Sequence, residues 1–206
     1  MLDDGPGHAL RRADCTVCGI CAKVCHAGAL SIVASMRTVE DVMDEVMADH
    51  LFYQVSGGGM TVSGGEPMAQ PAFTLALLKA AKALGLHICL DTCGFCAPED
   101  LLLAIPHTDL FLFDLKTSAD IHEHWTGVPL EPILRSLHAL DDAGGMIRLR
   151  CPLIPGVNMT EAHLENIAGV VASLNNISGI DIVPYHPVGE SKQKVIGREM
   201  AIDRKS

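Results

Sequence analysis

The stretch GGGMTVSGGEPMAQP, from Gly57 to Pro71, decides how the rest of the chain is interpreted. It runs from a short apolar segment into two glycines, a glutamate and a proline, and then into a helix-like segment. Gly64 and Gly65 can adopt backbone angles that are closed to other residues, and they leave room for a ligand against the main chain. Glu66 offers a carboxylate to a cationic group such as an amine. The stretch therefore predicts a strand, a ligand-binding turn and a helix.

The segments that follow alternate between short apolar runs and helical periods. We expect five strands, at residues 60–63, 86–91, 109–116, 146–156 and 179–186. We expect helices at residues 72–85, 98–105, 129–145 and 160–174, after an earlier helix that Thr38 and Asp41 begin with a capping box and that runs through Met47. This alternation predicts an α/β fold with a parallel sheet. An open doubly wound sheet and a closed or partial β/α barrel both fit the pattern.

Every expected strand is followed by, or ends in, a polar group. One such residue alone is most often a turn or cap residue, but here all the strands share the feature. Ligands of β/α proteins bind at the carboxyl ends of the strands, so we expect a common polar site there. The candidate residues are Gly64, Gly65, Glu66, Asp91, Asp114, Lys116, Arg150 and His186. Acidic and basic groups together predict a zwitterionic, polar ligand, and no phosphate-loop pattern is present.

Four cysteines near the N-terminus follow the spacing C-x2-C-x2-C-x3-C. They are Cys15, Cys18, Cys21 and Cys25. Bacterial-type ferredoxins hold iron–sulfur clusters with this run, so a cluster is the favoured interpretation. Zinc sites usually need a second separated pair, which does not follow at the usual distance; zinc and unliganded structural cysteines remain the alternatives. Eight cysteines without an export signal predict the reducing cytosol.

The other cysteines and histidines give weaker signals. Cys93 and Cys96 form a CxxC after the second strand and are interpreted as packed thiols, with a redox or metal role as the alternative. Cys89 and Cys151 are expected in the core. The histidines His87, His107, His138 and His163 share no ligand-like spacing and are expected at surface or satisfied positions. The sequence contains no run of 18 apolar residues, so it predicts no membrane-spanning helix. The net charge of −10 disfavours nucleic-acid binding through a basic surface.

Six segments, taken in order, resemble those of the glycyl-radical-enzyme activating enzymes, which are radical S-adenosylmethionine (SAM) proteins related to pyruvate formate-lyase activase. They are VSGGGMTVSGGEPMAQP, LDTCGF, DLFLFDLK, IHEHWTGV, IRLRCPLIPG and PYHPVGESK, within residues 38–198. The resemblance implies a partial β/α barrel, SAM, a [4Fe–4S] cluster and reductive cleavage of SAM to methionine and a 5′-deoxyadenosyl radical. That radical takes a hydrogen atom from a glycine of a partner glycyl radical enzyme. Reduced flavodoxin or ferredoxin is the implied electron donor.

The resemblance also assigns roles to the candidate residues. By motif position, Gly64, Gly65 and Glu66 would hold the SAM amino group. Lys116, Arg150 and His186 would contact the rest of SAM. We further expect Asp91 and Asp114 to favour a bound cation beside the SAM carboxylate, and the four-cysteine run resembles the ferredoxin-type insert of many activases.

The chain departs from the family at its defining motif, a C-x3-C-x2-C loop after the first barrel strand. In the N-terminal run, Cys15-x2-Cys18-x2-Cys21 is one residue short at the first gap, and an extension from Cys21 and Cys25 would need a cysteine at position 28, which is Gly28. We therefore expect no catalytic cluster ligands, and a chain that begins within the insert and lacks the first barrel strand. Residues 1–36 are predicted to be a partial ferredoxin-type iron–sulfur insert and residues 37–206 an incomplete radical SAM barrel. The predicted function is that of an activating enzyme, inactive as this chain alone. The alternatives are a single-cluster SAM-binding or electron-transfer module and a zinc-stabilised β/α binding protein.

Overall fold

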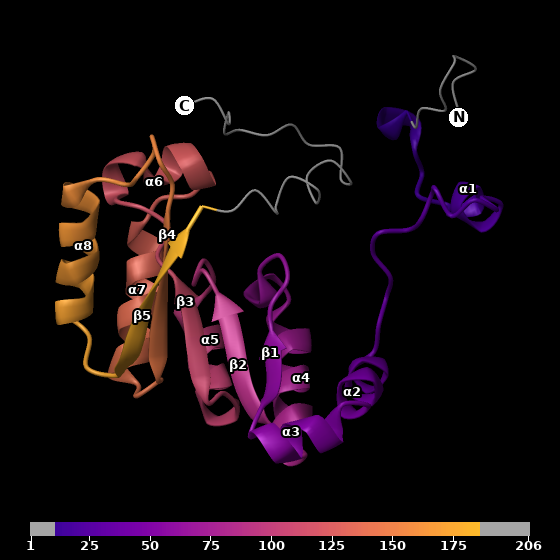
Figure 1. Ribbon diagram of the computed structural model, residues 1–206, viewed down its shortest axis with the longest axis horizontal. Helices are drawn as coiled ribbons and strands as arrows, with labels where there is room; N and C mark the ends of the chain where they lie inside the picture. Colours follow the sequence, from indigo (N-terminus) through magenta and orange to yellow (C-terminus); the bar gives the residue numbers. More distant parts are fainter. Residues whose placement is uncertain (1–10, 186–206) are drawn as a thin grey trace. The chain divides into compact units, whose positions relative to one another are not determined.

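The computed structural model describes residues 11–185 of the chain. These residues fall into two compact units, which meet between Met36 and Arg37 in the sequence. The first unit contains a 3-10 turn, η1 (Arg12–Asp14), and a one-turn helix, α1 (Ile20–Lys23). The second unit contains the sheet (Figure 1). Within residues 11–185, no helix has the length and apolar character that crossing a membrane requires.

A parallel sheet of five strands organises the second unit. The strands are β1 (Gly59–Val62), β2 (His87–Thr92), β3 (Leu110–Asp114), β4 (Ile147–Leu153) and β5 (Ile177–Pro184). They lie side by side in chain order, without the reversal that marks a doubly wound sheet. A sheet in chain order is a section of barrel wall, so the structure decides between the two alternatives and confirms the α/β partial-barrel fold.

Two helices of the second unit precede the sheet and the others fill the connections between its strands. They are α2 (Val39–Met47), α3 (His50–Ser56), α4 (Pro71–Ala83), α5 (Pro98–Ala104), α6 (Ala119–Thr126), α7 (Glu131–Asp142) and α8 (Glu161–Ala172), with 3-10 turns η2 (Pro67–Ala69) and η3 (Ile105–His107). The predicted capping box is confirmed, because Thr38 and Asp41 exchange side-chain and backbone hydrogen bonds at 3.1 and 2.8 Å. The sequence did not predict α3 or α6. Helix α3 exposes three apolar side chains, so it lacks a polar outer face that would reveal its period.

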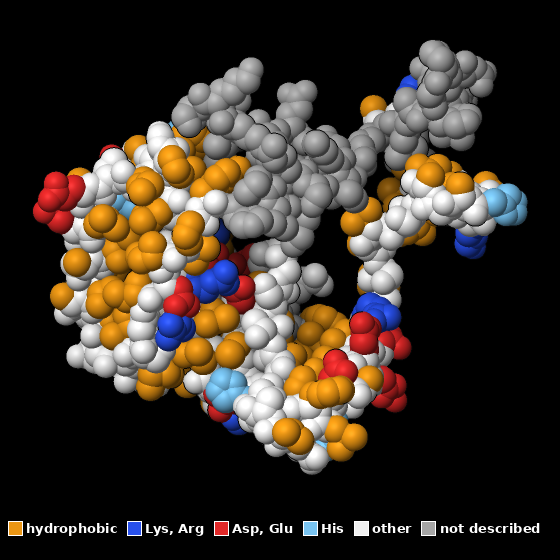
Figure 2. Space-filling model, viewed as in Figure 1, with side chains coloured by type: hydrophobic (Ala, Val, Ile, Leu, Met, Phe, Trp, Pro, Cys, Tyr) orange, Lys and Arg blue, Asp and Glu red, His pale blue; other side chains and the backbone are white. Residues whose placement is uncertain are grey.

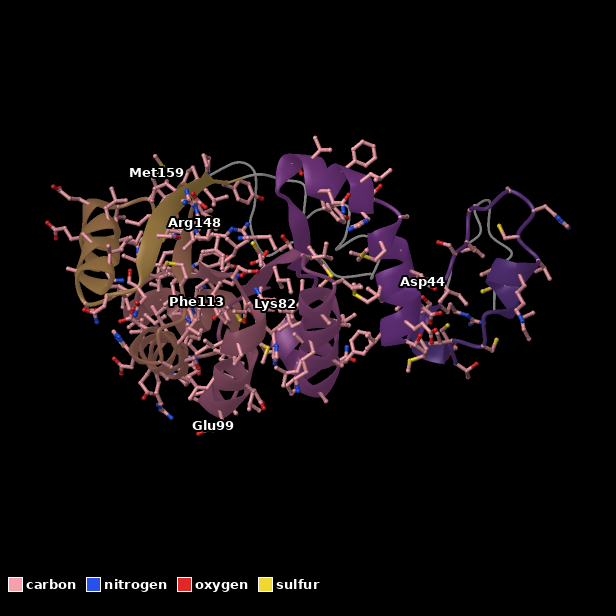
Figure 3. All side chains as sticks on the ribbon, turned by 90° about the horizontal axis from the view of Figure 1, so that it is seen from below. Asp44, Lys82, Glu99, Phe113, Arg148 and Met159 are labelled. Carbon is pink, nitrogen blue, oxygen red and sulfur yellow. The ribbon has the colours of Figure 1, made fainter. Side chains whose placement is uncertain are left out.

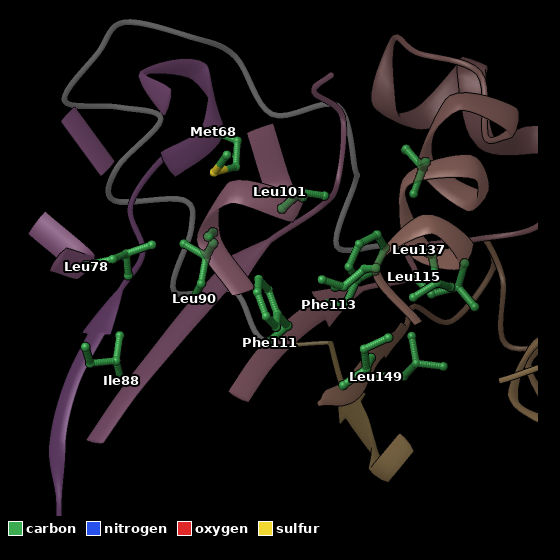
Figure 4. Packing of buried hydrophobic residues seen from close by; sticks show 14 of the residues in the cluster. Met68, Leu78, Ile88, Leu90, Leu101, Phe111, Phe113, Leu115, Leu137 and Leu149 are labelled. Carbon is green, nitrogen blue, oxygen red and sulfur yellow. The ribbon is translucent and has the colours of Figure 1, made fainter. Parts of the chain in front are cut away.

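One face of the sheet forms the core. Alternate side chains of the three central strands point toward α4, α5 and α7 and are fully buried (Figure 4). They include Ile88, Leu90, Phe111, Phe113, Ile147, Leu149 and Cys151. The intervening residues point to the opposite, more exposed face, because successive strand residues alternate sides. Cys151 is buried as expected, whereas Cys89 shares the open face and is only half-buried.

Candidate functional site

A polar pocket of about 300 Å³ lies at the carboxyl ends of β1 to β4. Its lining includes seven of the predicted site residues: Gly64, Gly65, Glu66, Asp91, Asp114, Lys116 and Arg150. Ser63, Thr92 and Cys93 complete the lining. The remaining predicted residue, His186, lies outside the described residues. The structure thus brings together groups that are as much as 86 positions apart in the sequence, from Gly64 to Arg150.

The register of the sheet places the charged residues of the pocket. Asp114 and Arg150 are direct partners across β3 and β4. Nη1 of Arg150 donates to Oδ2 of Asp91 at 2.7 Å, and Nζ of Lys116 donates to Oδ2 of Asp114 at 2.8 Å. Two acids of the pocket are therefore paired with its two bases. In the space-filling view, basic and acidic side chains meet among hydrophobic ones on this unit (Figure 2).

Glu66 is held differently from the other two acids. Its Oε1 accepts from the backbone N–H of Met68 at 3.0 Å and from the hydroxyl of Thr92 at 2.7 Å. Its Oε2 accepts from the backbone N–H of Cys93 at 2.8 Å. Among residues 11–185 no Lys or Arg forms an ion pair with it. The Glu66 charge is consequently met by neutral donors, so among the described residues the pocket has one acid that no base balances.

The turn after β1 offers the open backbone that the sequence predicted. A Cβ atom added at Gly64 or Gly65 would meet no other atom within 4 Å, so the space beside the main chain is free. Ser63, at the start of this turn, donates from Oγ to Oδ2 of Asp91 at 3.0 Å. Sequence reasoning missed Ser63 and the partners of Glu66. Their only signal was their position directly after a strand.

Arg148 also lies on the open face of the sheet but does not line the pocket. Its guanidinium donates two hydrogen bonds to the carboxylate of Asp181 on β5, at 2.7 and 2.6 Å, and it lies against β5 in Figure 3. Gly179 leaves room for this approach, because a Cβ there would stand 2.9 Å from Nη1 of Arg148. Because successive strand residues alternate sides, Arg148 and Arg150 lie on the same face of β4. Arg148 pairs with Asp181 outside the pocket, whereas Arg150 pairs with Asp91 inside it.

The four N-terminal cysteines are exposed or half-exposed. Within the described part of the chain, no three His, Cys, Asp or Glu side chains converge closely enough to hold a metal ion. In this conformation the four sulfur atoms do not form a ligand set for a cluster. A local hydrogen bond nevertheless favours a thiolate at Cys18, because the backbone of Ile20 lowers the pKa of that thiol.

Cys93 and Cys96 have the opposite character. Burial, followed by the neighbouring side chain of Glu66, raises the pKa of Cys93 to about 11. Burial and the neighbouring charge of Glu66 raise the pKa of Cys96 to about 12. Both groups are neutral thiols near neutral pH, which agrees with the interpretation as packed thiols rather than reactive ones.

Fold and pocket together define a partial β/α barrel with a polar cleft at its strand ends. Residues 13–167 match the profile of the radical SAM superfamily. The chain is 39% identical over 195 residues to the isethionate sulfite-lyase activating enzyme of Nitratidesulfovibrio vulgaris, covering 93% of this chain and 63% of that protein. It is 36% identical over 225 residues to the choline trimethylamine-lyase activating enzyme of Oleidesulfovibrio alaskensis, covering 92% and 73%.

A crystal structure shows the same likeness. A domain of the pyruvate-formate lyase-activating enzyme from Bacteroides vulgatus superimposes with a TM-score of 0.59 at 33% identity, covering 68% of this chain and 91% of that one. The chain belongs to the radical SAM superfamily and, within it, to the glycyl-radical-enzyme activating enzymes. Members of the superfamily use SAM and a [4Fe–4S] cluster. The chain spans 63% of the length of the isethionate sulfite-lyase activating enzyme that it matches.

Proposed function

We propose that this chain binds SAM in the pocket and serves in an activating enzyme that generates a glycyl radical on a partner protein. The observation that carries the proposal is the gathering of three acids and two bases around one open backbone turn. SAM presents an ammonium, a carboxylate and a sulfonium group, so it needs charges of both signs within one small site. The unbalanced charge of Glu66 suits the ammonium group.

The proposed roles follow from the positions of the donors and acceptors. The backbone of Gly64 and Gly65 and the carboxylate of Glu66 receive the amino group. Lys116 and Arg150, together with His186, contact the rest of the ligand. Three hydrogen bonds from the protein occupy most of the lone-pair sites of Glu66, of which a carboxylate has about four. The carboxylate is therefore oriented before the ligand arrives.

Cleavage of SAM requires an electron, which a [4Fe–4S] cluster supplies in this superfamily. The described residues hold no ligand set for such a catalytic cluster. Cys89, Cys93 and Cys96 do have C-x3-C-x2-C spacing, but Cys89 lies inside β2 and the three side chains do not converge on a metal site. We therefore propose that this chain binds SAM but does not cleave it alone. Residues 1–36 would form the partial ferredoxin-type insert, with Cys15, Cys18, Cys21 and Cys25 as ligands, and residues 37–206 the barrel.

A second candidate function is an iron–sulfur electron-transfer or SAM-binding module without radical chemistry. The observation that favours it is that four free, accessible thiols and a polar pocket occur in a chain whose described residues hold no ligand set for a catalytic cluster; the thiols are Cys15, Cys18, Cys21 and Cys25. Reconstitution with iron and sulfide separates the two candidates from a zinc protein. About one cluster per chain, without any spectral change on SAM addition, would support the electron-transfer module.

The proposed partners are a glycyl radical enzyme, as the names of the curated relatives indicate, and reduced flavodoxin or ferredoxin as electron donor. The net charge of −10 argues against a nucleic-acid partner, and we propose no membrane partner. All eight cysteines are free thiols, which suits the reducing cytosol.

Equilibrium dialysis with radiolabelled SAM tests the binding site. We expect Glu66→Gln and Arg150→Gln each to weaken SAM binding roughly tenfold, because each removes a charge-assisted hydrogen bond. Arg135→Gln is the matched control, since Arg135 pairs with Glu131 on the exposed face of α7. Equal affinities for all the variants would refute the assignment. Formation of 5′-deoxyadenosine by the reconstituted, dithionite-reduced chain would refute the proposed lack of cleavage.

A further inference from the structure

Thr92, the last residue of β2, stands between two loops of the pocket. Its side chain is 2% exposed, and its hydroxyl makes two hydrogen bonds. It donates to Oε1 of Glu66 at 2.7 Å and accepts from the backbone N–H of Gly94 at 3.0 Å. A hydroxyl has a single proton, and the N–H of Gly94 approaches its lone pairs. The backbone of the β2–α5 turn therefore directs that proton toward Glu66.

The position of Gly94 is itself fixed by the core. Gly94 has φ of +71°, and a Cβ atom there would stand 2.3 Å from Cζ of Phe113. Phe113 is fully buried on β3, so its ring has no room to move aside. A chain of contacts consequently runs from the aromatic core through Gly94 and Thr92 to the carboxylate of Glu66.

We propose that Thr92 is a positioning residue that orients the Glu66 carboxylate toward the amino group of SAM. The inference rests on the proposed function, because it takes that amino group as the ligand of Glu66. Thr92 and Cys93 reach Glu66 from the end of β2, whereas Met68 reaches it from its own turn. Donors on two loops fix both the position and the plane of the carboxylate, which one loop alone would leave free to rotate.

The hydrogen bonds leave one place on Glu66 for the ligand. Three protein donors occupy three of the roughly four lone-pair sites of its carboxylate. The remaining site suits the ammonium group of SAM, while the three donors hold the carboxylate in place.

Three variants isolate the hydroxyl. Thr92→Val keeps the β-branched shape and removes the donor, and Thr92→Ser restores it. Thr74→Val is the matched control: Thr74 is also 2% exposed and donates at 2.7 Å to the same turn, but to the carbonyl of Pro67 rather than to Glu66. A loosened turn would affect both valine variants, whereas a misdirected carboxylate would affect only Thr92→Val.

The first readout needs no ligand. The amides of Met68 and Cys93 are bonded to Glu66, so we expect Thr92→Val to speed their hydrogen–deuterium exchange roughly tenfold, the equivalent of one lost hydrogen bond to a charged group. Thr92→Ser should exchange like the unmodified chain. Unchanged exchange in Thr92→Val would overturn the proposed tether whether or not the chain binds SAM.

The second readout compares two ligands in the full chain. We expect Thr92→Val to weaken SAM binding roughly tenfold and to leave 5′-methylthioadenosine, which lacks the amino-acid end, within about twofold. Thr74→Val should leave both affinities within about twofold, and Thr92→Val should have no further effect on SAM affinity in a Glu66→Gln background. Equal losses for both ligands would overturn the positioning role in favour of a structural one.

Two outcomes separate this inference from the proposed function. Unchanged SAM affinity in Thr92→Val, beside a weakened Glu66→Gln, would overturn the role of Thr92 alone. Unchanged SAM affinity in Glu66→Gln would overturn the assignment of Glu66 and, with it, the positioning of that carboxylate for SAM.

Discussion

Arg150 on β4 reaches across β3 to pair with Asp91 on β2, with 2.7 Å between Nη1 and Oδ2. Oδ2 of Asp91 also accepts the hydroxyl of Ser63 from the turn after β1. One carboxylate thus connects three of the loops or strand ends that form the pocket. A ligand carboxylate that binds Arg150 must compete with the carboxylate of Asp91. Ligand binding is therefore coupled to the Asp91–Arg150 ion pair.

The Asp91–Arg150 pair is expected to stabilise the fold. Its side chains are 19% and 32% exposed, so Arg150→Gln leaves a half-buried carboxylate unpaired beside Asp114. We expect the free energy of unfolding to fall by about 1–2 kcal/mol, less than for a fully buried pair because water screens the charges. Urea unfolding of Arg150→Gln, Asp91→Asn and the double variant measures a coupling of about 1 kcal/mol. Additive losses would contradict the pairing.

Potassium should strengthen SAM binding. Asp91 and Asp114 are neutralised here by Arg150 and Lys116; when SAM draws those bases away, a cation can compensate the two carboxylates. We expect SAM to bind at least about fivefold tighter in potassium chloride than in tetramethylammonium chloride at equal ionic strength, which keeps screening constant. Equal dissociation constants in the two salts would count against a cation site.

The cysteines should differ in their pH dependence. The backbone of Ile20 and the side chain of Thr16 lower the pKa of the exposed Cys18, whereas burial raises that of Cys96 to about 12. Iodoacetamide reacts with thiolates, so at pH 8 we expect Cys18 to be alkylated at least about a hundredfold faster than Cys96. Peptide mass spectrometry over a pH series gives both rates. Similar rates at pH 8 would refute the buried, neutral thiol.

The raised pKa values of Cys93 and Cys96 should make the folded chain less stable in alkali. Cys93 and Cys96 have pKa values in the folded chain of about 11 and 12, above the ordinary value of 9.0. Unfolded thiols therefore ionise first, so the stabilisation is complete below about pH 9 and is lost as the pH rises toward the folded values. A Cys96→Ala variant should show a shallower fall of unfolding free energy between these limits.

Gly94→Ala should be more destabilising than an equivalent change elsewhere. Gly144 is the matched control, with φ of +81° and no atom within 4 Å of an added Cβ. Both substitutions carry the cost of a left-handed residue, about 1–2 kcal/mol, but only Gly94→Ala drives a Cβ into Phe113, for about 1–3 kcal/mol more. Thermal unfolding of the two variants measures the difference. Equal losses would show that the β2–α5 turn can shift away from the ring.

Short-range patterns in the sequence determined several features of the fold and of the candidate site. Gly64, Gly65 and Glu66 stand directly after an apolar run, and that order alone predicts a strand that ends in an open turn. Charged residues at the ends of successive strands predict a common site, because parallel strands deliver their carboxyl ends to one edge. The capping box at Thr38 is likewise a short-range pattern. These features depend on neighbours in the sequence, so they are visible there.

Tertiary structure alone decided the strand order, the partners of the charges and the orientation of Glu66. Alternating strands and helices are compatible with two topologies, and only the packing of β1 to β5 side by side selects the barrel wall. Asp91 meets Arg150, 59 positions away, and Glu66 meets Thr92, 26 positions away, because of register and turn geometry. Hydrogen bonds act over about 3 Å, whereas sequence patterns carry no such distances.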